Sequence, residues 1–215
     1  MSIKQIETVN GTYFFEEKYL QTGGAKMNKK ISEDNLLIFR EVLNSRKLDF
    51  YLIFGTLLGA VREGDFIEYD EDIDVCIKYA ELDNLKSLLF VLREKGLEVI
   101  RFTGELLSLE RKGDYIDIYL FRHEKGKSWR CLGYEFPEKF FLTTEKINFL
   151  GYDFGCPKDK FEFLEICYGG DWKIPIVGKH ARAVKNIWIR ENIIPILPLW
   201  LKNTLKAVNR YLKGF

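Results

Sequence analysis

Histidine and cysteine, the side chains that build most structural zinc sites, are scarce in this chain. Its 215 residues include two histidines and four cysteines. No two cysteines form a C-x-x-C pair, and none has a histidine at ligand spacing; they are Cys76, Cys131, Cys156 and Cys167. This pattern argues against a structural zinc site. A chain of this size with a large apolar fraction needs no disulfides, so we expect free thiols in a reducing compartment.

Signals for export or for membrane insertion are also lacking. The N-terminal stretch does not show the basic and then apolar pattern of a signal peptide. No run reaches the ~18 apolar residues that a membrane-spanning helix requires. We therefore expect a cytoplasmic protein. Charge of one sign is not in excess either, because the net charge is +1. The sequence therefore predicts no general attraction to nucleic acid.

What the chain does have is enough apolar surface for a core. Apolar residues make up 47% of it, which argues against disorder over most of its length. The length predicts one domain with appendages. We expect an N-terminal extension over residues 1–30, a folded domain over 31–178 and a C-terminal extension over 179–215.

Hydrophobic periodicity predicts helices within the folded domain. Ser32 is placed to cap a helix whose apolar residues recur at helical spacing. These residues are Leu36, Phe39 and Leu43. Two further helices are predicted over 83–96 and 159–168, the first with an Asp start and a Gly stop.

Short apolar runs predict five strands. They cover residues 50–54, 73–79, 98–102, 106–112 and 115–122. A Gly-Asp turn joins the last two in a hairpin. The chain after Arg122 is expected to be a basic loop and then irregular to Gly155. Helices beside a mixed sheet with antiparallel pieces indicate an α+β fold.

An acidic cluster stands directly before one of these strands. Four carboxylates lie within the five residues from Asp70 to Asp74. In a strand, alternate side chains share a face, so Asp72 and Asp74 point one way while Ile73 and Val75 point into the core. Two carboxylates ~7 Å apart on one face repel each other unless a cation lies between them. Magnesium, which prefers hard oxygen ligands, is such a cation.

A third carboxylate occurs in a neighbouring strand. Asp117 lies between two isoleucines in an apolar run, where an unpartnered carboxylate is costly to bury. A metal shared with Asp72 and Asp74 would be a suitable partner. Asp114 is a rival, but it follows a glycine in the predicted turn, where water can solvate it.

A phosphate site is predicted just upstream of the acidic cluster. Gly55 ends a strand and starts a short helix, where free N–H groups and the helix dipole suit a phosphate. Thr56 adds a hydroxyl donor. Arg62, one or two turns further on, can clamp phosphate oxygens in a bidentate manner.

Each of these features also has a simpler interpretation. A charge run is usually a solvated surface loop, Asp117 could face water on an edge strand, and Gly55-Thr56 could be an ordinary turn. A calcium-binding EF-hand loop would use carboxylates at positions 1, 3, 5 and 12. Asp70, Asp72, Asp74 and Glu81 match these positions. Val75 stands where that loop requires glycine, which argues against calcium.

The motifs together resemble the LicD/fukutin-related family. The stretch "FGTLLGAVREGDFIEYDEDIDV" (54–75) is similar to that family's G-T-L-L-G, R and W-D-x-D-I-D pattern. "YIDIYLF" (115–121) resembles its next acidic strand, and "ICYGGDWKIP" (166–175) its closing segment with one extra residue. Tyr69 replaces the usual Trp and Glu71 a frequent Asp. The resemblance covers roughly residues 36–175.

The resemblance implies a nucleotidyltransferase-like fold over 31–178 and a metal-dependent transferase. Family members transfer phosphocholine, glycerol phosphate or ribitol phosphate from a CDP-activated donor to a sugar hydroxyl of a surface glycan or its lipid-linked precursor. Asp72, Asp74 and Asp117 would be catalytic and would hold Mg²⁺, or Mn²⁺ in its place, with Asp70 supporting them. Asp117 could instead be the base for the acceptor hydroxyl. The phosphate-binding residues would be Gly55, Thr56 and Arg62.

Two other functions stay open at this point. One is a nucleotidyltransferase that uses an NTP and releases pyrophosphate. The other is a non-catalytic module that binds nucleotide or glycan.

The sequence predicts a basic amphipathic helix in the C-terminal extension. Its basic residues are Lys202, Lys206, Arg210 and Lys213, and leucines and a valine fill another face. Such a helix over 195–215 can contact the inner face of a membrane or pack on the core. His180, in a basic segment, is expected at the surface.

Overall fold

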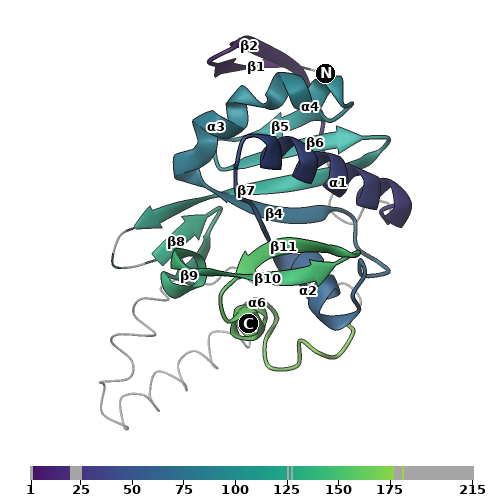
Figure 1. Ribbon diagram of the computed structural model, residues 1–215, viewed down its shortest axis with the longest axis vertical. Helices are drawn as coiled ribbons and strands as arrows, with labels where there is room; N and C mark the ends of the chain where they lie inside the picture. The colour runs from purple at the N-terminus through teal and green to yellow at the C-terminus, as the bar shows by residue number, and fades with distance from the viewer. Residues whose placement is uncertain (1, 20–25, 125, 127, 177–180, 182–215) are drawn as a thin grey trace, which may run out of the picture.

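The computed structural model describes residues 2–19, 26–124, 126, 128–176 and 181 (Figure 1). These residues form a mixed sheet with helices on both sides, which confirms the α+β prediction. The predicted C-terminal helix and His180 lie outside the described residues. In the part of the chain that is described, no helix is long and apolar enough to cross a membrane.

Seven strands follow one another across the main sheet. Their order is β10 (Thr144–Phe149), β11 (Tyr152–Pro157), β3 (Tyr51–Leu52), β4 (Ile73–Lys78), β7 (Asp114–Glu124), β6 (Leu106–Arg111) and β5 (Glu98–Phe102). The β4–β7 and β11–β3 pairs are parallel, and the other neighbours are antiparallel. Strands β8 (Ser128–Cys131) and β9 (Tyr134–Pro137) continue from the far end of β7.

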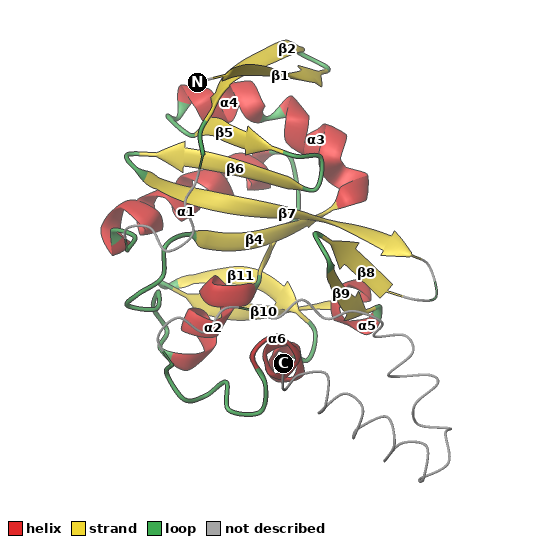
Figure 2. Cartoon of the chain, turned by 180° about the vertical axis from the view of Figure 1, so that it is seen from behind, coloured by secondary structure: helices red, strands yellow, loops and turns green. Residues whose placement is uncertain are grey.

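Helices cover one face of this sheet, and no described helix covers the β5, β6 and β7 part of the other face (Figure 2). The α-helices are α1 (Lys29–Ser45), α2 (Phe54–Arg62), α3 (Leu82–Ser87), α4 (Leu89–Glu94), α5 (Lys139–Leu142) and α6 (Lys160–Tyr168), and a 3₁₀ turn, η1, spans Tyr79–Glu81. In Figure 2, which shows the molecule from behind, α1, α3 and α4 lie beyond the strands. No helix of the described chain crosses the near face of β5, β6 and β7 in that view.

Alternation along the two central strands explains this difference between the faces. In β4 and β7 the fully buried residues on one face are all aliphatic: Ile73, Val75, Ile77, Ile116, Ile118 and Leu120. Helix α1 packs on this face through β7. Its own inward residues include Leu36, Phe39 and Leu43, the predicted helical face. The opposite face carries the acidic side chains, because successive residues of a strand alternate.

Several predicted elements are confirmed with small shifts at their ends. The strands predicted over 73–79, 98–102, 106–112 and 115–122 are β4, β5, β6 and β7, and the helix predicted over 159–168 is α6. The hairpin between β6 and β7 is also present. All four cysteines are free, as the sequence predicted, and the structure buries all four.

The predicted cap of the first helix is wrong. Helix α1 starts four residues earlier than Ser32 would require, and the side chain of Asn28 accepts hydrogen bonds from the N–H groups of Lys30 and Ile31. Ser32 lies inside the helix, where its hydroxyl donates to Asp114 over 3.0 Å. Asn28, which the sequence analysis did not consider, is therefore the cap of this helix.

Three other expectations on local structure are corrected. The helix predicted over 83–96 is split at Leu88 into α3 and α4. The strand predicted over 50–54 is only Tyr51–Leu52, and the chain then turns into α2. The region expected to be irregular contains β8, β9, β10 and β11, which form the antiparallel pairs β8–β9 and β10–β11.

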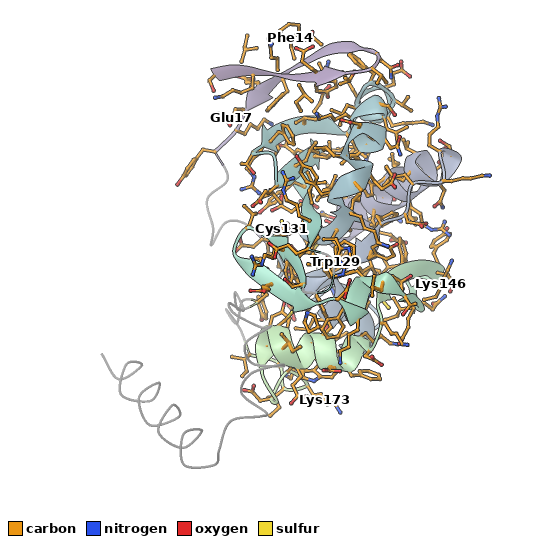
Figure 3. All side chains as sticks on the ribbon, turned by 90° about the vertical axis from the view of Figure 1, so that its left-hand side faces the viewer. Phe14, Glu17, Trp129, Cys131, Lys146 and Lys173 are labelled. Atoms are coloured by element: carbon orange, nitrogen blue, oxygen red, sulfur yellow. The ribbon has the colours of Figure 1, made fainter. Side chains whose placement is uncertain are left out.

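The predicted N-terminal extension contains a hairpin that packs on the core. Strands β1 (Ser2–Thr8) and β2 (Gly11–Glu17) pair along their whole length. Their inward residues Ile6, Tyr13 and Phe15 are buried. Figure 3 shows this hairpin, with Phe14 and Glu17, at the opposite end of the molecule from Lys173. Directly after it, the N–H of Lys18 donates to the Ile100 carbonyl of β5 over 2.9 Å.

The cap assignment predicts a stability change. Asn28→Ala leaves N–H groups at the start of α1 without their partner, so we expect the free energy of unfolding in urea to fall by about 1 kcal/mol. Asn148→Ala, at an exposed site whose side chain makes only a 3.5 Å contact, is the control and should change it by less than ~0.5 kcal/mol. Equal stability of the two variants would contradict the assignment.

Candidate active site

A row of polar side chains crosses four strands on the face of the sheet opposite α1. The strand register pairs Asp74 of β4 with Asp117 of β7, and Asp117 with Ser108 of β6. Ser108 is in turn paired with Arg101 of β5. Cross-strand partners share a face and lie side by side. The register therefore brings two of the predicted site residues together and adds two that the sequence analysis did not select.

The other two acids of the cluster lie at the start of β4. Asp72 immediately precedes the strand, two residues before Asp74. Burial, and then the charge of Asp117, raise the pKa of the Asp72 carboxyl well above its ordinary value. Burial, and then the charge of Asp72, do the same for the pKa of Asp74. Burial also raises the pKa of Asp70 to about 6. The four acids therefore share one low-dielectric, mutually repulsive environment.

Asp70 is held against the backbone of Gly55. A Cβ atom at position 55 would lie 2.6 Å from Oδ2 and 3.0 Å from Oδ1 of Asp70, which is closer than real contacts allow. The absent side chain of this glycine is thus what admits the carboxylate. The Oδ2 atom is buried and has no hydrogen-bond partner among the described residues. A buried carboxylate oxygen without a partner is costly.

Asp74 is tied to the start of α2. Its Oδ2 accepts a hydrogen bond from the Gly55 N–H over 3.0 Å, and its own N–H donates to the Thr56 hydroxyl over 2.8 Å. The sequence analysis assigned these groups of Gly55 and Thr56 to phosphate. In the structure they hold β4 against α2, and Thr56 is fully buried.

Arg62 lies at the other end of α2 from Gly55. Seven residues separate them, which corresponds to about 10 Å along a helix axis. Its guanidinium pairs with the carboxylate of the next residue, Glu63, at 2.5 Å. The structure thus brings Gly55 and Thr56 to the acidic cluster but does not place Arg62 beside them.

Asp117 has partners that the sequence analysis missed. Arg101 donates from Nη2 to both oxygens of Asp117, at 2.9 and 2.7 Å. The Ser108 hydroxyl donates to Oδ1 over 2.6 Å. Burial raises the pKa of Asp117, and the Arg101 charge followed by the Ser108 hydrogen bond lower it in part. Ser108 could have been found, because it is a lone polar residue in an apolar strand, like Asp117 itself.

Four tyrosines surround the acids. Burial raises the pKa of each ring hydroxyl, and nearby aspartates raise it further. The tyrosines are Tyr115, Tyr119, Tyr134 and Tyr168. The rings of Tyr119 and Tyr134 pack on Phe54, with centroids 5.0 and 4.6 Å away. These hydroxyls stay protonated at neutral pH and can donate hydrogen bonds at the edge of the acidic cluster.

The acids supply the right ligand chemistry for a divalent metal, although they are not arranged as a complete binding set. Among the described residues, no three His, Cys, Asp or Glu side chains are positioned together to hold a metal. The unpartnered oxygen of Asp70 and the repulsion among Asp70, Asp72 and Asp74 are what a hard cation would relieve. The donor set therefore fits magnesium or manganese.

Comparison with solved structures concerns the fold alone. The chain superposes on the solution structure of the antibiotic-resistance factor ANT(2'')-Ia with a TM-score of 0.51 and 13% sequence identity, over 87% of this chain and 95% of that chain. This likeness shows a shared mixed α+β architecture.

The family follows from the sequence comparison. Residues 47–159, more than half of the chain, match the family model described as "LicD/FKTN/FKRP, nucleotidyltransferase domain". The chain belongs to this family, which confirms the resemblance that the motifs indicated.

Two human relatives show the extent of the similarity. The chain is 27% identical over 179 residues to "Ribitol-5-phosphate transferase FKTN" of Homo sapiens, covering 75% of this chain and 38% of that protein. It is 27% identical over 149 residues to "Ribitol 5-phosphate transferase FKRP" of Homo sapiens, covering 60% of this chain and 29% of that protein. The chain thus spans less than half the length of either relative.

The close approach at Gly55 predicts a sharp effect of a single methyl group. In Gly55→Ala the new Cβ must displace the Asp70 carboxylate, so we expect the free energy of unfolding to fall by about 1–3 kcal/mol. Gly170→Ala is the control, because its Cβ would meet nothing closer than 3.8 Å. Urea unfolding of both variants measures the difference, and a Gly55→Ala protein as stable as the control would contradict the assigned contact.

The raised pKa of Asp70 predicts a pH dependence. Because the folded pKa, about 6, exceeds the ordinary value of 3.8, the folded state keeps this proton to higher pH than the unfolded state. The contribution of Asp70 to stability therefore falls as pH rises from about 4 to about 6 and stays low above that range.

Asp70→Asn removes this effect. In the presence of a chelator at about pH 8, we expect the variant to exceed the parent in stability by about 1–3 kcal/mol, with a flatter pH profile. Urea unfolding at about pH 5 and about pH 8 tests this. Asp153→Asn, at an exposed position of β11, is the control. An unchanged pH profile in Asp70→Asn would show that Asp70 is solvated.

Proposed function

We propose that this protein transfers a phospho-alcohol, of the phosphocholine, glycerol phosphate or ribitol phosphate class, from a CDP-activated donor to a sugar hydroxyl. Family membership supports phospho-alcohol transfer, because the two human relatives are named as ribitol-5-phosphate transferases. The acceptor in this proposal is a surface glycan or its lipid-linked precursor. Its place of action is the inner face of a membrane, with residues 195–215 as the membrane contact.

The observation that carries the proposal is the acidic cluster itself. Asp74 is paired with Asp117 across β4 and β7, and Asp72 lies two residues before Asp74. Burial raises the pKa of all three, and the charges of neighbouring acids raise the pKa of Asp72 and Asp74 further. A buried group of acids destabilises the fold, so its presence favours a function that needs negative charge at this point. Binding the diphosphate of a nucleotide-activated donor through a divalent cation is such a function.

In this proposal Asp72 and Asp74 hold the cation and Asp70 supports them. Magnesium or manganese, when bound, neutralises charge on the donor phosphates and on the leaving group. The tyrosine hydroxyls that remain protonated donate hydrogen bonds to phosphate oxygens; the charge of Asp74 contributes to the raised pKa of Tyr119, Tyr134 and Tyr168. Because Asp74 engages the Gly55 N–H, phosphate contact there requires Asp74 to share that hydrogen bond.

The chemical step is an in-line displacement at phosphorus. The acceptor oxygen forms a bond to the phosphorus that carries the alcohol, and the bond from that phosphorus to the oxygen of CMP breaks. CMP leaves with the electron pair, and the acceptor hydroxyl gives up its proton. Asp117 is the acid of the cluster that we assign to receive this proton or to orient the hydroxyl.

Product analysis separates this function from its two rivals. The full chain is incubated with Mg²⁺ and CDP-choline, CDP-glycerol, CDP-ribitol or CTP, together with sugar acceptors. Release of CMP from a CDP-alcohol supports the proposal. Release of pyrophosphate from CTP supports an NTP-dependent nucleotidyltransferase instead, and binding of nucleotide without either product supports a non-catalytic module.

The roles of Asp72 and Asp74 predict the response to mutation. Asp74→Asn keeps an oxygen to accept the Gly55 hydrogen bond but loses the charge, so we expect the rate of CMP release to fall by about 100-fold or more. The same holds for Asp72→Asn, while a chelator should abolish the reaction. Asp153→Asn, at its exposed site on β11, should retain the parent rate. Full activity of Asp74→Asn would contradict the proposed centre.

A further inference from the structure

Strand β5 contains an irregularity that decides which side chain faces the acids. Val99 is paired with Leu109, and Arg101 is paired with Ser108, so Ile100 is an extra residue in the ladder. A regular ladder would place Ile100 opposite Ser108 and turn Arg101 toward the apolar face. A β-bulge of one residue reverses this, because a one-residue slip moves every side chain to the other face.

The bulge is held from the outer side of the sheet. The Ile100 carbonyl accepts the 2.9 Å hydrogen bond from the Lys18 N–H, just after the N-terminal hairpin. The Ile100 side chain is buried. The extra residue therefore has both a backbone partner and an apolar environment, and the position of Arg101 is a defined feature of the fold.

Arg101 contacts Asp117 directly and also through the hydroxyl of Ser108. Its Nη2 contacts both carboxylate oxygens, and its Nε donates to the Ser108 hydroxyl over 2.9 Å. That hydroxyl donates in turn to Asp117. The side chain of Asp117 is 7% exposed and that of Arg101 is 27% exposed. Hydrogen bonds between two charged groups are shorter and stronger than hydrogen bonds between neutral groups.

This arrangement occupies a carboxylate that the proposed function requires. Both oxygens of Asp117 face Arg101, and the described acids do not form a complete metal-binding set. A cation that recruits Asp117 must therefore weaken its bond to the guanidinium. The positive charge of Arg101 also opposes a second cation beside the same carboxylate.

We propose that Arg101 is a built-in counter-ion, which holds Asp117 in place in the metal-free protein and competes with the divalent cation for this carboxylate. Arg101 is thus a positioning residue that acts through Asp117. The inference rests on the proposed function in one respect, that a divalent cation binds at the acidic cluster, and it adds Asp117 to Asp72 and Asp74 as a ligand of that cation.

The test is the affinity of the full-length protein for Mn²⁺ alone, measured by isothermal titration calorimetry without nucleotide. Removing the competitor in Arg101→Gln should tighten binding by about tenfold or more and should lower the stability of the metal-free protein in urea. Arg101→Lys keeps a charge but loses the fork, so its affinity should lie between those of the parent and Arg101→Gln. This second variant keeps the test decisive if Arg101→Gln does not fold.

The chain offers a matched control on β8. Arg130 donates from Nη2 to buried Glu135 over 2.9 Å, and Ser128 donates to the same carboxylate over 3.0 Å, so this trio also combines an arginine, a serine and a buried acid. Arg130 additionally pairs with Glu124 at 2.8 Å. Arg130→Gln should lower stability without changing the Mn²⁺ affinity. Comparing Arg130→Gln with Arg101→Gln therefore separates the effect of losing an ion pair from the effect of losing a competitor for the metal.

The outcomes distinguish this inference from the proposed function. If the parent binds Mn²⁺ and the Arg101 variants bind it equally or more weakly, the competition does not exist, while the transferase proposal stands. If neither the parent nor any variant binds Mn²⁺ without nucleotide, the counter-ion inference fails, and the transferase proposal is then decided by the release of CMP from a CDP-alcohol. Tighter binding in the Arg101 variants but not in Arg130→Gln supports the counter-ion role.

Discussion

The repulsion among carboxylates on one face of the central sheet is the constraint on which the rest of the site depends. The charges of Asp70 and Asp117 raise the pKa of both Asp72 and Asp74. Three of these four acids are held by different contacts. Asp74 bonds to the start of α2, Asp117 is gripped by Arg101, and Asp70 fits against a glycine. The fold thus concentrates negative charge where a cation and a diphosphate can compensate it.

Residues near the N-terminus support this arrangement at both ends. The N–H of Met27 donates to the Asp70 carbonyl over 2.9 Å, and Lys29 pairs with Asp65 at 2.7 Å, which ties the Asp70 loop to the start of α1. At the other end of the row, Lys18 supports the bulge that presents Arg101. A segment that lies outside the family match, which begins at residue 47, therefore contributes to the geometry of the site.

The same constraint explains why some predicted phosphate contacts have other partners. The N–H of Gly55 and the hydroxyl of Thr56 both form hydrogen bonds with Asp74. These two groups at the start of α2 therefore already have partners when a substrate binds. Arg62 is at the far end of that helix and pairs with Glu63. The cation beside the acids is instead Arg101 of β5. The hydrogen-bond donors around them are tyrosines from β7, β9 and α6.

The sequence by itself determined the α+β class, four of the sheet strands, the family motifs and the common face of Asp72 and Asp74. These depend on local spacing, because alternation and helical periodicity are properties of neighbouring residues. Only the tertiary structure decided that Asn28 caps α1, that Gly55 admits Asp70 and that Arg101 faces Asp117. Each of these depends on strand register, a bulge or a close approach between distant segments, which no local pattern specifies.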